Sequence, residues 1–301
     1  MPETAPHTGI RAPVGVDTTQ PSIARVYDFS LGGKDNYAAD RAAFEKILEI
    51  APRQGDVSLM NRRWLHRVVR FLAGPAGIDQ FLDIGAGLPT VGNTHQIAHE
   101  EHREASVVYV DNDPVVAAHG QVLLEQNQYT HFVQADILEP GTLLENRTVT
   151  QYFELDRPIA LLVCGLLHHL DDDADPARLM REYIERLPTG SYVAITNFWD
   201  PGEEDAELHD LARRLERAFV ELGLGSGWYR TRSQQMEYFD GLELLSPGWN
   251  EPPGLTELEE WWPSGPSTRE RFPEERLVLG GVGHKAMPDP PRLRAVGPDT
   301  A

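Results

Sequence analysis

The chain has almost no cysteine and a shortage of positive charge. Cys164 is the single cysteine among 301 residues, so the chain can form neither an intrachain disulfide nor a cluster of thiolate metal ligands. It contains 27 Lys and Arg residues and 47 Asp and Glu residues, so its net charge is −20. This negative charge repels phosphate backbones and anionic membrane surfaces, and no dense Lys/Arg run offsets the repulsion locally. The composition therefore predicts no nucleic-acid partner and no membrane partner.

Long apolar runs are also lacking. No stretch is long enough to span a bilayer, and the first 20 residues contain no apolar segment of a secretion signal. We therefore expect a cytoplasmic protein. Residues 1–20 are rich in Pro, Thr and Gly and predict a disordered arm, and residues 287–301 predict a disordered tail.

Helical patterns come before any convincing strand. Residues 38–50 place Phe44 and Ile47 on one broad apolar face. A second apolar period runs over residues 59–73, with Ser58 as its expected N-cap and Gly74-Pro75 at its end. We assign residues 21–75 to an N-terminal helical lid segment.

Short apolar runs then alternate with helical segments, which predicts an α/β domain with a doubly wound parallel sheet covered on both faces. In such sheets, ligands bind at the carboxyl ends of the strands. Late segments around residues 234–245 and 276–285 indicate an antiparallel pair that finishes the sheet, and the role of the Pro/Trp-rich loop 246–275 stays open. The expected strands are residues 81–85, 107–111, 131–136, 159–165 and 191–198, and the expected helices are residues 90–102, 114–127, 174–187 and 203–222.

The first of these strands runs into a Gly-x-Gly turn, Gly85-Ala86-Gly87. Missing side chains let a ligand approach the backbone there, although a simple tight turn has the same pattern. Asp83, inside the strand, suits a ligand that carries an ammonium group better than a dinucleotide pyrophosphate. The dinucleotide fingerprint G-x-G-x-x-G also fails, because Thr90 occupies its last position.

Acidic residues end the next two strands as well. Asp111 stands where a carboxylate can accept hydrogen bonds from ribose hydroxyls. Asp136 and Ile137 form an acid-plus-apolar pair that suits the exocyclic amine and the face of a purine. A single such acid is commonly a helix cap, but acids after three successive strands favour a nucleoside ligand.

These motifs resemble those of a known group of enzymes. DIGAG, YVDNDP and QADILEP resemble the motifs of class I S-adenosylmethionine-dependent methyltransferases. PSIARVYDFSLGGKDNYAADR, FLDIGAGLPT, VVYVDNDPVV and GGVGHK are similar to the actinobacterial S-adenosyl methyltransferase family once classed as a domain of unknown function. The resemblance covers residues 20–285. It implies a Rossmann-like, mostly parallel seven-stranded sheet with the last strand antiparallel, a methyltransferase domain over residues 76–286, and S-adenosylmethionine as cofactor. It leaves the acceptor open.

The resemblance also implies roles for individual residues. Gly85, Ala86 and Gly87 would face the methionine end of the cofactor, with Asp83 beneath it. Asp111 would hold the ribose, Asn112 would line the adenine, Asp136 would bond the adenine amine and Ile137 would pack on its ring.

The segment YDFSLGGKDNYAADR, residues 27–41, is predicted to act as a lid over an open cleft. It is not a phosphate-binding loop, because Asp35 follows Gly33-Lys34 where that motif needs Ser or Thr. Gly32 and Gly33 would press the backbone near the cofactor, Tyr27 or Tyr37 would cover it, and Lys34 would neutralise its carboxylate. A plain turn around Asp35 and Asn36 is the alternative.

Catalysis is expected beyond the fourth strand. His168 or His169 could act as general base, with His168 the stronger candidate, since imidazole titrates near neutral pH. The alternative is that one histidine caps the following helix and the other points to solvent. The string HHLDDD, residues 168–173, could also indicate a metal site. However, the side chains of adjacent histidines tend to point in different directions, and the acids suit a helix N-terminus. We predict no metal. Five aromatic residues could roof an acceptor pocket or pack the sheet edge: Trp228, Tyr229, Trp249, Trp261 and Trp262.

The leading hypothesis is a small-molecule methyltransferase that uses S-adenosylmethionine. A non-catalytic protein that binds the same cofactor and regulates another is the alternative, followed by a nicotinamide-dependent oxidoreductase. The methylated atom and the oligomeric state stay open.

Overall fold

The computed structural model describes residues 16–89, 92–123, 127–224, 226–248, 250–261 and 271–286. Predictions for most of the N-terminal arm, the C-terminal tail, Thr90, Trp249, Trp262 and residues 262–270 of the Pro/Trp-rich loop lie outside these ranges. Within them, no helix combines the length and apolar character that crossing a membrane requires.

Three helices precede the first strand: α1 (Ile23–Ser30), α2 (Ala38–Ile50) and α3 (Gln54–Ala73). The α2 helix occupies its predicted range. The α3 helix begins before the predicted start, so the assignment of Ser58 as N-cap was wrong. Ser58 lies inside α3, and its hydroxyl accepts a hydrogen bond of 2.7 Å from the Ser30 hydroxyl. A serine in a helix can serve tertiary packing as well as capping, and the local pattern did not distinguish the two.

The sheet has the order β3-β2-β1-β4-β5-β8-β6, and the short β7 also pairs with β8. The strands β1 to β5 pair in parallel, and β8 runs antiparallel to β5. The predicted α/β class and seven-strand, mostly parallel sheet are confirmed; β6 and β7 share its last edge position. The strands are β1 (Gln80–Ile84), β2 (Ser106–Asp111), β3 (Thr130–Gln134), β4 (Ala160–Cys164), β5 (Tyr192–Phe198), β6 (Glu243–Leu244), β7 (Thr256–Glu257) and β8 (Val278–His284).

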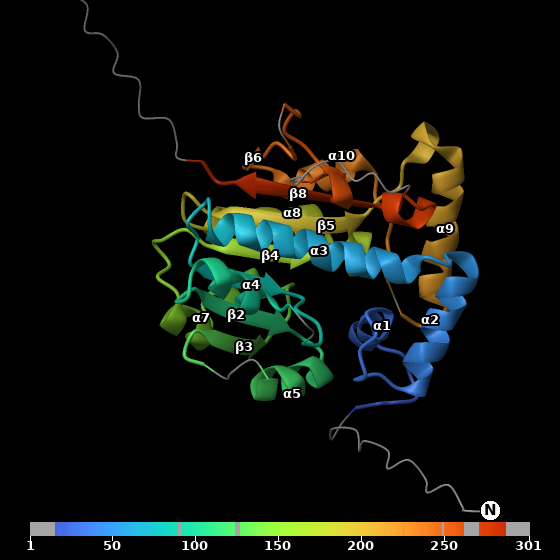
Figure 1. The fold of residues 1–301 in the computed structure, drawn as a ribbon, viewed down its shortest axis with the longest axis horizontal. Helices are drawn as coiled ribbons and strands as arrows, with labels where there is room; N and C mark the ends of the chain where they lie inside the picture. Colours follow the sequence, from blue (N-terminus) through green and yellow to red (C-terminus); the bar gives the residue numbers. More distant parts are fainter. Residues whose placement is uncertain are drawn as a thin grey trace, which may run out of the picture.

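Helices cover both faces of the sheet (Figure 1). One face packs on α3, α4 (Thr94–Glu101) and α5 (Pro114–Leu123), and the other packs on α6 (Pro140–Leu144), α7 (Arg147–Tyr152) and α8 (Pro176–Arg186). Side chains alternate between two hydrophobic cores, because successive residues of a strand point to opposite faces. In β1, for example, Phe81 joins the first core and Leu82 the second.

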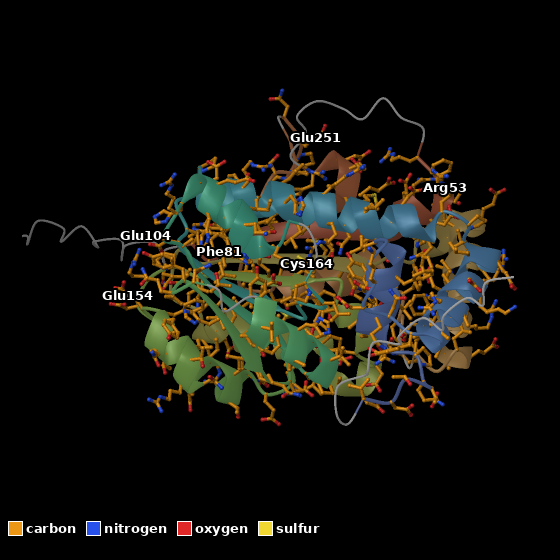
Figure 2. The ribbon with its side chains drawn as sticks, turned by 60° about the horizontal axis from the view of Figure 1, so that its bottom comes forward. Arg53, Phe81, Glu104, Glu154, Cys164 and Glu251 are labelled. Atoms are coloured by element: carbon orange, nitrogen blue, oxygen red, sulfur yellow. The ribbon has the colours of Figure 1, made fainter. Side chains whose placement is uncertain are left out.

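The carboxyl ends of the parallel strands point toward the N-terminal helices. Figure 2 shows Glu104 and Glu154, which precede β2 and β4, at the opposite end of the molecule from Arg53 at the start of α3. The α9 helix (Ala206–Glu221) lies beside α2 at that same end (Figure 1). The helices α1, α2, α3 and α9 therefore surround the strand ends, where a ligand site is expected.

Two further short elements follow α9: α10 (Arg232–Met236) and the 3₁₀ turn 237–239. Gln235 of α10 donates hydrogen bonds to the carbonyls of Phe198 and Arg230, at 2.9 and 3.0 Å. These bonds fasten the segment after α9 to the end of β5.

Candidate ligand cavity at the strand ends

A cavity of about 400 Å³ lies between the strand ends and the surrounding helices. One part of its wall comes from the loops that follow β1, β2, β3 and β4. The rest comes mainly from α1, α2, α3 and α9. We call these two parts the strand-end half and the lid half.

The Gly-x-Gly turn forms the floor of the strand-end half. Gly85 and Gly87 have φ angles of +74° and +65°, which favour glycine. A Cβ on Gly85 would lie 2.7 Å from the Leu166 side chain, so the loop after β4 packs directly on this turn. Around Gly87 the space is open. Gly85, Ala86 and Gly87 all line the cavity, as predicted from their position after β1.

Asp83 lines the cavity from within β1 and is almost fully buried, with 6% exposure. Burial raises the pKa of its carboxyl to about 6, opposed by a 2.6 Å hydrogen bond from the Thr94 hydroxyl and by the charge of Arg62. The neighbouring groups of the chain therefore compensate this carboxylate only in part. A cationic group of a ligand would complete the compensation.

Asp111 ends β2 beside the same turn. Its carboxylate accepts hydrogen bonds of 2.9 Å from the backbone N–H groups of Gly87 and Asp113. Burial raises its pKa despite these bonds. Asn112, the next residue, also lines the cavity, and its side chain is exposed.

Asp136 and Ile137 line the cavity after β3. The strand itself ends at Gln134, so Asp136 lies in the following turn, where its carboxylate accepts a 3.0 Å bond from the N–H of Leu138. Ile137 is buried, and its carbonyl accepts a 2.7 Å bond from the Tyr183 hydroxyl. The cavity thus brings together the acids after three strands, as the sequence predicted.

The predicted lid segment divides into two parts. Tyr27 of α1 lines the cavity, but Gly32, Gly33 and Lys34 do not. A Cβ on Gly33 would overlap the carboxylate of Asp28, which packs against that position. In this structure the glycine makes room for a side chain of its own loop, and a contact between this loop and the cofactor stays a prediction.

Asp28 organises that loop. Its carboxylate accepts hydrogen bonds from the N–H of Asp35 at 3.0 Å and from the Asn36 amide at 2.9 Å, and its carbonyl accepts one from the N–H of Gly33 at 2.8 Å. The alternative of a turn built around Asp35 and Asn36 therefore describes these residues. Lys34 is exposed on the outside of the turn.

His168 lines the cavity as a flat, buried ring. It stacks on Phe198 with ring centroids 3.7 Å apart and an interplanar angle of 11°. Burial is the main cause that lowers its pKa well below the ordinary value, and the neighbouring His169 and Arg230 lower it further. The ring is therefore neutral at pH 7, and its role as general base stays a prediction.

The side chains of the HHLDDD string go to separate partners. His169 Nδ1 lies 2.8 Å from the Ser226 hydroxyl, Asp171 accepts a bond from the N–H of Ala174, and Asp172 pairs with Arg230 at 3.0 Å. Over the described ranges, no three potential metal ligands come together.

The aromatic residues proposed as a roof lie elsewhere. Trp261 is fully buried against Trp64, with ring centroids 5.8 Å apart. Tyr229 stacks on Phe198 at 4.8 Å, on the outer side of the cavity wall. The packing of α2 and α9 over the strand ends instead brings Phe44 and Phe219 to the cavity.

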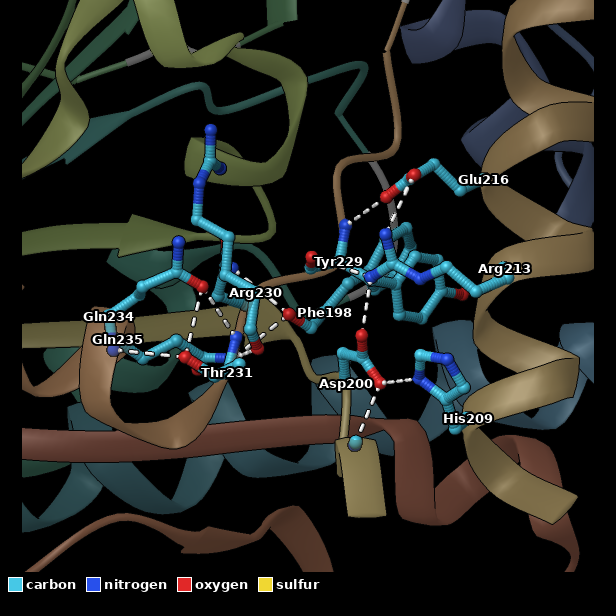
Figure 3. Close-up of polar contacts among 12 residues, drawn as sticks. Phe198, Asp200, His209, Arg213, Glu216, Tyr229, Arg230, Thr231, Gln234 and Gln235 are labelled. Atoms are coloured by element: carbon cyan, nitrogen blue, oxygen red, sulfur yellow. Dashed lines mark hydrogen bonds and ion pairs between the residues drawn. The ribbon is translucent and has the colours of Figure 1, made fainter. Parts of the chain in front are cut away.

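Polar contacts hold α9 in that position (Figure 3). Asp200, just after β5, lies 2.6 Å from His209 Nδ1 and 2.7 Å from Arg213, both on α9. Glu216 of α9 accepts a 2.9 Å bond from the N–H of Tyr229. The helix that carries Phe219 is thereby fastened to the sheet.

Sequence reasoning missed the polar residues that α3 contributes. Ser58, Asn61 and Arg62 line the cavity, as does Leu65. Ser58, Asn61 and Leu65 are spaced three and four residues apart, so they share one side of the helix. Polar residues inside an otherwise apolar helical stripe are the signal that could have identified them.

The chain is similar to other proteins over most of its length. A family model described as S-adenosyl methyltransferase matches residues 10–286. The crystal structure of a presumed methyltransferase from Thermobifida fusca is 39% identical, with a TM-score of 0.83, over 91% of this chain and 98% of that chain. A DUF574 family protein from Streptomyces avermitilis is 35% identical, with a TM-score of 0.81, over 89% of this chain and 99% of that chain. No functionally curated protein matches the chain.

Proposed function

The chain belongs to the S-adenosyl methyltransferase family, and from that premise we propose that it methylates a small-molecule acceptor. S-adenosylmethionine, when bound, supplies a methyl group on a sulfonium that is open to in-line attack. The family is established by the match over most of the chain, whereas the acceptor and the residue roles are our proposals.

The observation that carries the proposal is the buried Asp83 carboxylate beside the open Gly85–Gly87 turn. Its pKa of about 6 reports a carboxylate whose burial the chain compensates incompletely. An α-ammonium group is a suitable partner, and the bare backbone of the turn leaves room for the rest of an amino acid. These residues therefore fit the methionine end of the cofactor.

The other strand-end residues fit its nucleoside. We assign the ribose hydroxyls to Asp111, the adenine amine to Asp136, and the two faces of the adenine to Asn112 and Ile137. Carboxylates are strong acceptors for hydroxyl and amine donors. Tyr27 closes the cavity from α1 and would cover the bound cofactor.

The chain's contribution to the reaction is then mainly orientation and exclusion of water. The helices above the strand ends cover the reacting centre, and the neutral ring of His168 lies in its wall. A neutral imidazole can take the proton that an acceptor loses, and we assign that role to His168. A lowered pKa makes it a weak base, so an acidic acceptor suits it best.

Calorimetric titration with S-adenosylhomocysteine tests the assignment. The native protein is expected to bind it, and Asp111→Ala is expected to lose about 100-fold in affinity. The loss corresponds to two hydrogen bonds to a charged group, at about 1.5 kcal/mol each. Asp210→Ala, an exposed acid on α9, is the matched control with unchanged affinity. No binding by the native protein at millimolar ligand would overturn the proposed function.

A further inference from the structure

The lid half of the cavity differs in chemistry from the strand-end half. Its wall comes from helices that are far apart in the sequence, together with β8, and most of its lining side chains are apolar. The lining side chains include Val26, Phe44, Val57, Leu65, Phe219 and Val278. If the cofactor occupies the strand-end half, the lid half is the space left for the acceptor.

Four of the five charged side chains of the described cavity wall lie in the strand-end half, and the fifth, Arg62, comes from α3. The four acids are Asp83, Asp111, Asp113 and Asp136, all at or beside strand ends. The one basic side chain, Arg62, lies close enough to Asp83 to lower its pKa. Arg62 already donates a 3.3 Å hydrogen bond to the Gly92 carbonyl and acts on Asp83. Apart from Arg62, the described lid half has no charged lining side chain, so burying a charged acceptor there would cost several kcal/mol.

Flat rings lie where the lid half meets the loop after β4. Phe198 stacks on His168, and Phe219 meets Phe198 edge-on with centroids 5.8 Å apart. Burial lowers the pKa of His168 and keeps the ring neutral. Such a wall suits a flat apolar molecule, since aromatic side chains pack well against rings by their edges as well as by their faces.

One polar group stands between the two halves. The Asn61 amide donates to the Tyr27 hydroxyl at 3.3 Å, and its carbonyl oxygen accepts a 2.8 Å bond from the Thr196 hydroxyl. All three residues line the cavity. A Cβ on Gly165 would lie 3.3 Å from Asn61 Nδ2, and the next residue, Leu166, packs on the Gly85 turn. Asn61 thus lies beside the loop that adjoins the expected methionine end of the cofactor.

We propose that the acceptor is a neutral, largely apolar ring compound with one hydroxyl, and that Asn61 orients that hydroxyl toward the methyl group. The inference rests on the proposed function, because it gives the strand-end half to the methyl donor. The hydroxyl exchanges hydrogen bonds with the Asn61–Tyr27–Thr196 group while the ring packs among Phe44, Phe198 and Phe219. The Asn61 amide acts as a positioning group and takes no proton.

The charge preference is tested with protein saturated with S-adenosylhomocysteine. Three probes of similar shape are titrated by ligand-observed NMR: 1-naphthol, 1-naphthoate and the 1-naphthylmethylammonium ion. We expect 1-naphthol to bind at least tenfold more tightly than either ion. Equal or tighter binding of an ion, or no binding of 1-naphthol, would overturn the inference. Failure of S-adenosylhomocysteine itself to bind would instead contradict the proposed function.

Two variants locate the binding. Ala24 lines the cavity from α1, so Ala24→Phe is expected to lower the 1-naphthol affinity at least tenfold and to change the S-adenosylhomocysteine affinity less than twofold. Asn61→Ala is expected to weaken 1-naphthol at least fivefold while the affinity for naphthalene stays constant. A general loss of structure would weaken both probes alike. Leu59→Ala, on the exposed side of α3, is the control. Unchanged 1-naphthol affinity in Ala24→Phe would place the probe outside the lid half and contradict the inference. An equal loss of affinity for 1-naphthol and naphthalene in Asn61→Ala would show that Asn61 does not orient the hydroxyl, which also contradicts the inference.

Discussion

Two buried carboxylates, Asp83 in the cavity wall and Asp40 outside it, have opposite surroundings. Asp83 in β1 has one side-chain donor among the described residues, the Thr94 hydroxyl, and burial raises its pKa to about 6. Asp40 in α2 is fully buried but accepts bonds from Arg25 Nε at 2.8 Å and from the N–H of Tyr37 at 2.7 Å.

We interpret the difference as that between a group left available to a ligand and a group that holds the fold together. The chain offsets the burial of Asp40 with its own donors, so this acid fastens the end of α1 to α2. The burial of Asp83 is offset only in part, which leaves a favourable interaction available to a ligand cation. The number of donors around a buried acid is thus a guide to its role.

The largest expected effect comes from removing the carboxylate of Asp40. Asp40→Ala leaves the Arg25 guanidinium buried without its carboxylate, which costs about 3–5 kcal/mol. We expect the melting temperature, measured by circular dichroism, to fall by roughly 10 °C. Asp56→Ala, which breaks a partly exposed pair with Arg53, is the control and should shift it by about 2 °C or less. A similarly small shift for Asp40→Ala would show that Asp40 does not stabilise the fold, and the contrast with Asp83 would be wrong.

Replacing Asp83 is expected to change the melting temperature in the opposite direction and raise it. A carboxyl whose folded pKa exceeds its unfolded pKa destabilises the fold increasingly as the pH rises from 3.8 to about 6, and by a constant amount above that. That penalty is on the order of 3 kcal/mol, and an amide recovers part of it. Asp83→Asn should therefore raise the melting temperature of the ligand-free protein by a few degrees at pH 7.5, with no gain near pH 3.5.

The same variant should lose affinity for S-adenosylhomocysteine, so stability and binding move in opposite directions. Asp210→Asn on the surface is the control for both measurements. A lower melting temperature for Asp83→Asn at pH 7.5 would show that the ionised carboxylate stabilises the empty protein, contrary to the comparison.

Lys34→Ala carries the smallest expected effect. Its side chain is exposed and does not line the cavity in this structure, so the melting temperature should not change. If the loop closes over the cofactor, the affinity for S-adenosylhomocysteine should fall by about two- to fivefold, as for a solvent-exposed ion pair. Lys46→Ala on α2 is a matched exposed control. Identical affinities for the native protein and Lys34→Ala would remove Lys34 from the site.

The strand-end half was predictable because its signals are local. An apolar strand, a glycine turn and an acid within a few residues specify where Asp83, Gly85 and Asp111 lie relative to one another once the strands pair in parallel. The parallel pairing follows from the alternation of strands and helices. The strand bounds were nearly as predicted: β1 and β4 end one residue earlier than expected, and β3 ends two residues earlier, at Gln134.

Local patterns failed where one pattern serves two purposes. A glycine pair can admit a ligand or a neighbouring side chain, and at Gly33 the Asp28 carboxylate takes the space. A serine ahead of an apolar period can cap a helix or lie inside it, as Ser58 does. In both cases the deciding partner is a side chain that local propensity does not specify.

By itself, the sequence determined the order of the elements, the sheet and the acids at the strand ends, because hydrophobic period and turn chemistry act over a few residues. Only the tertiary structure decided the lid half. Phe44 and Phe219 meet at one cavity because α2 and α9 pack on each other, and Asn61 reaches Thr196 because α3 packs on β4 and β5. Side-chain packing between distant segments sets these contacts, and no short stretch of the chain encodes them.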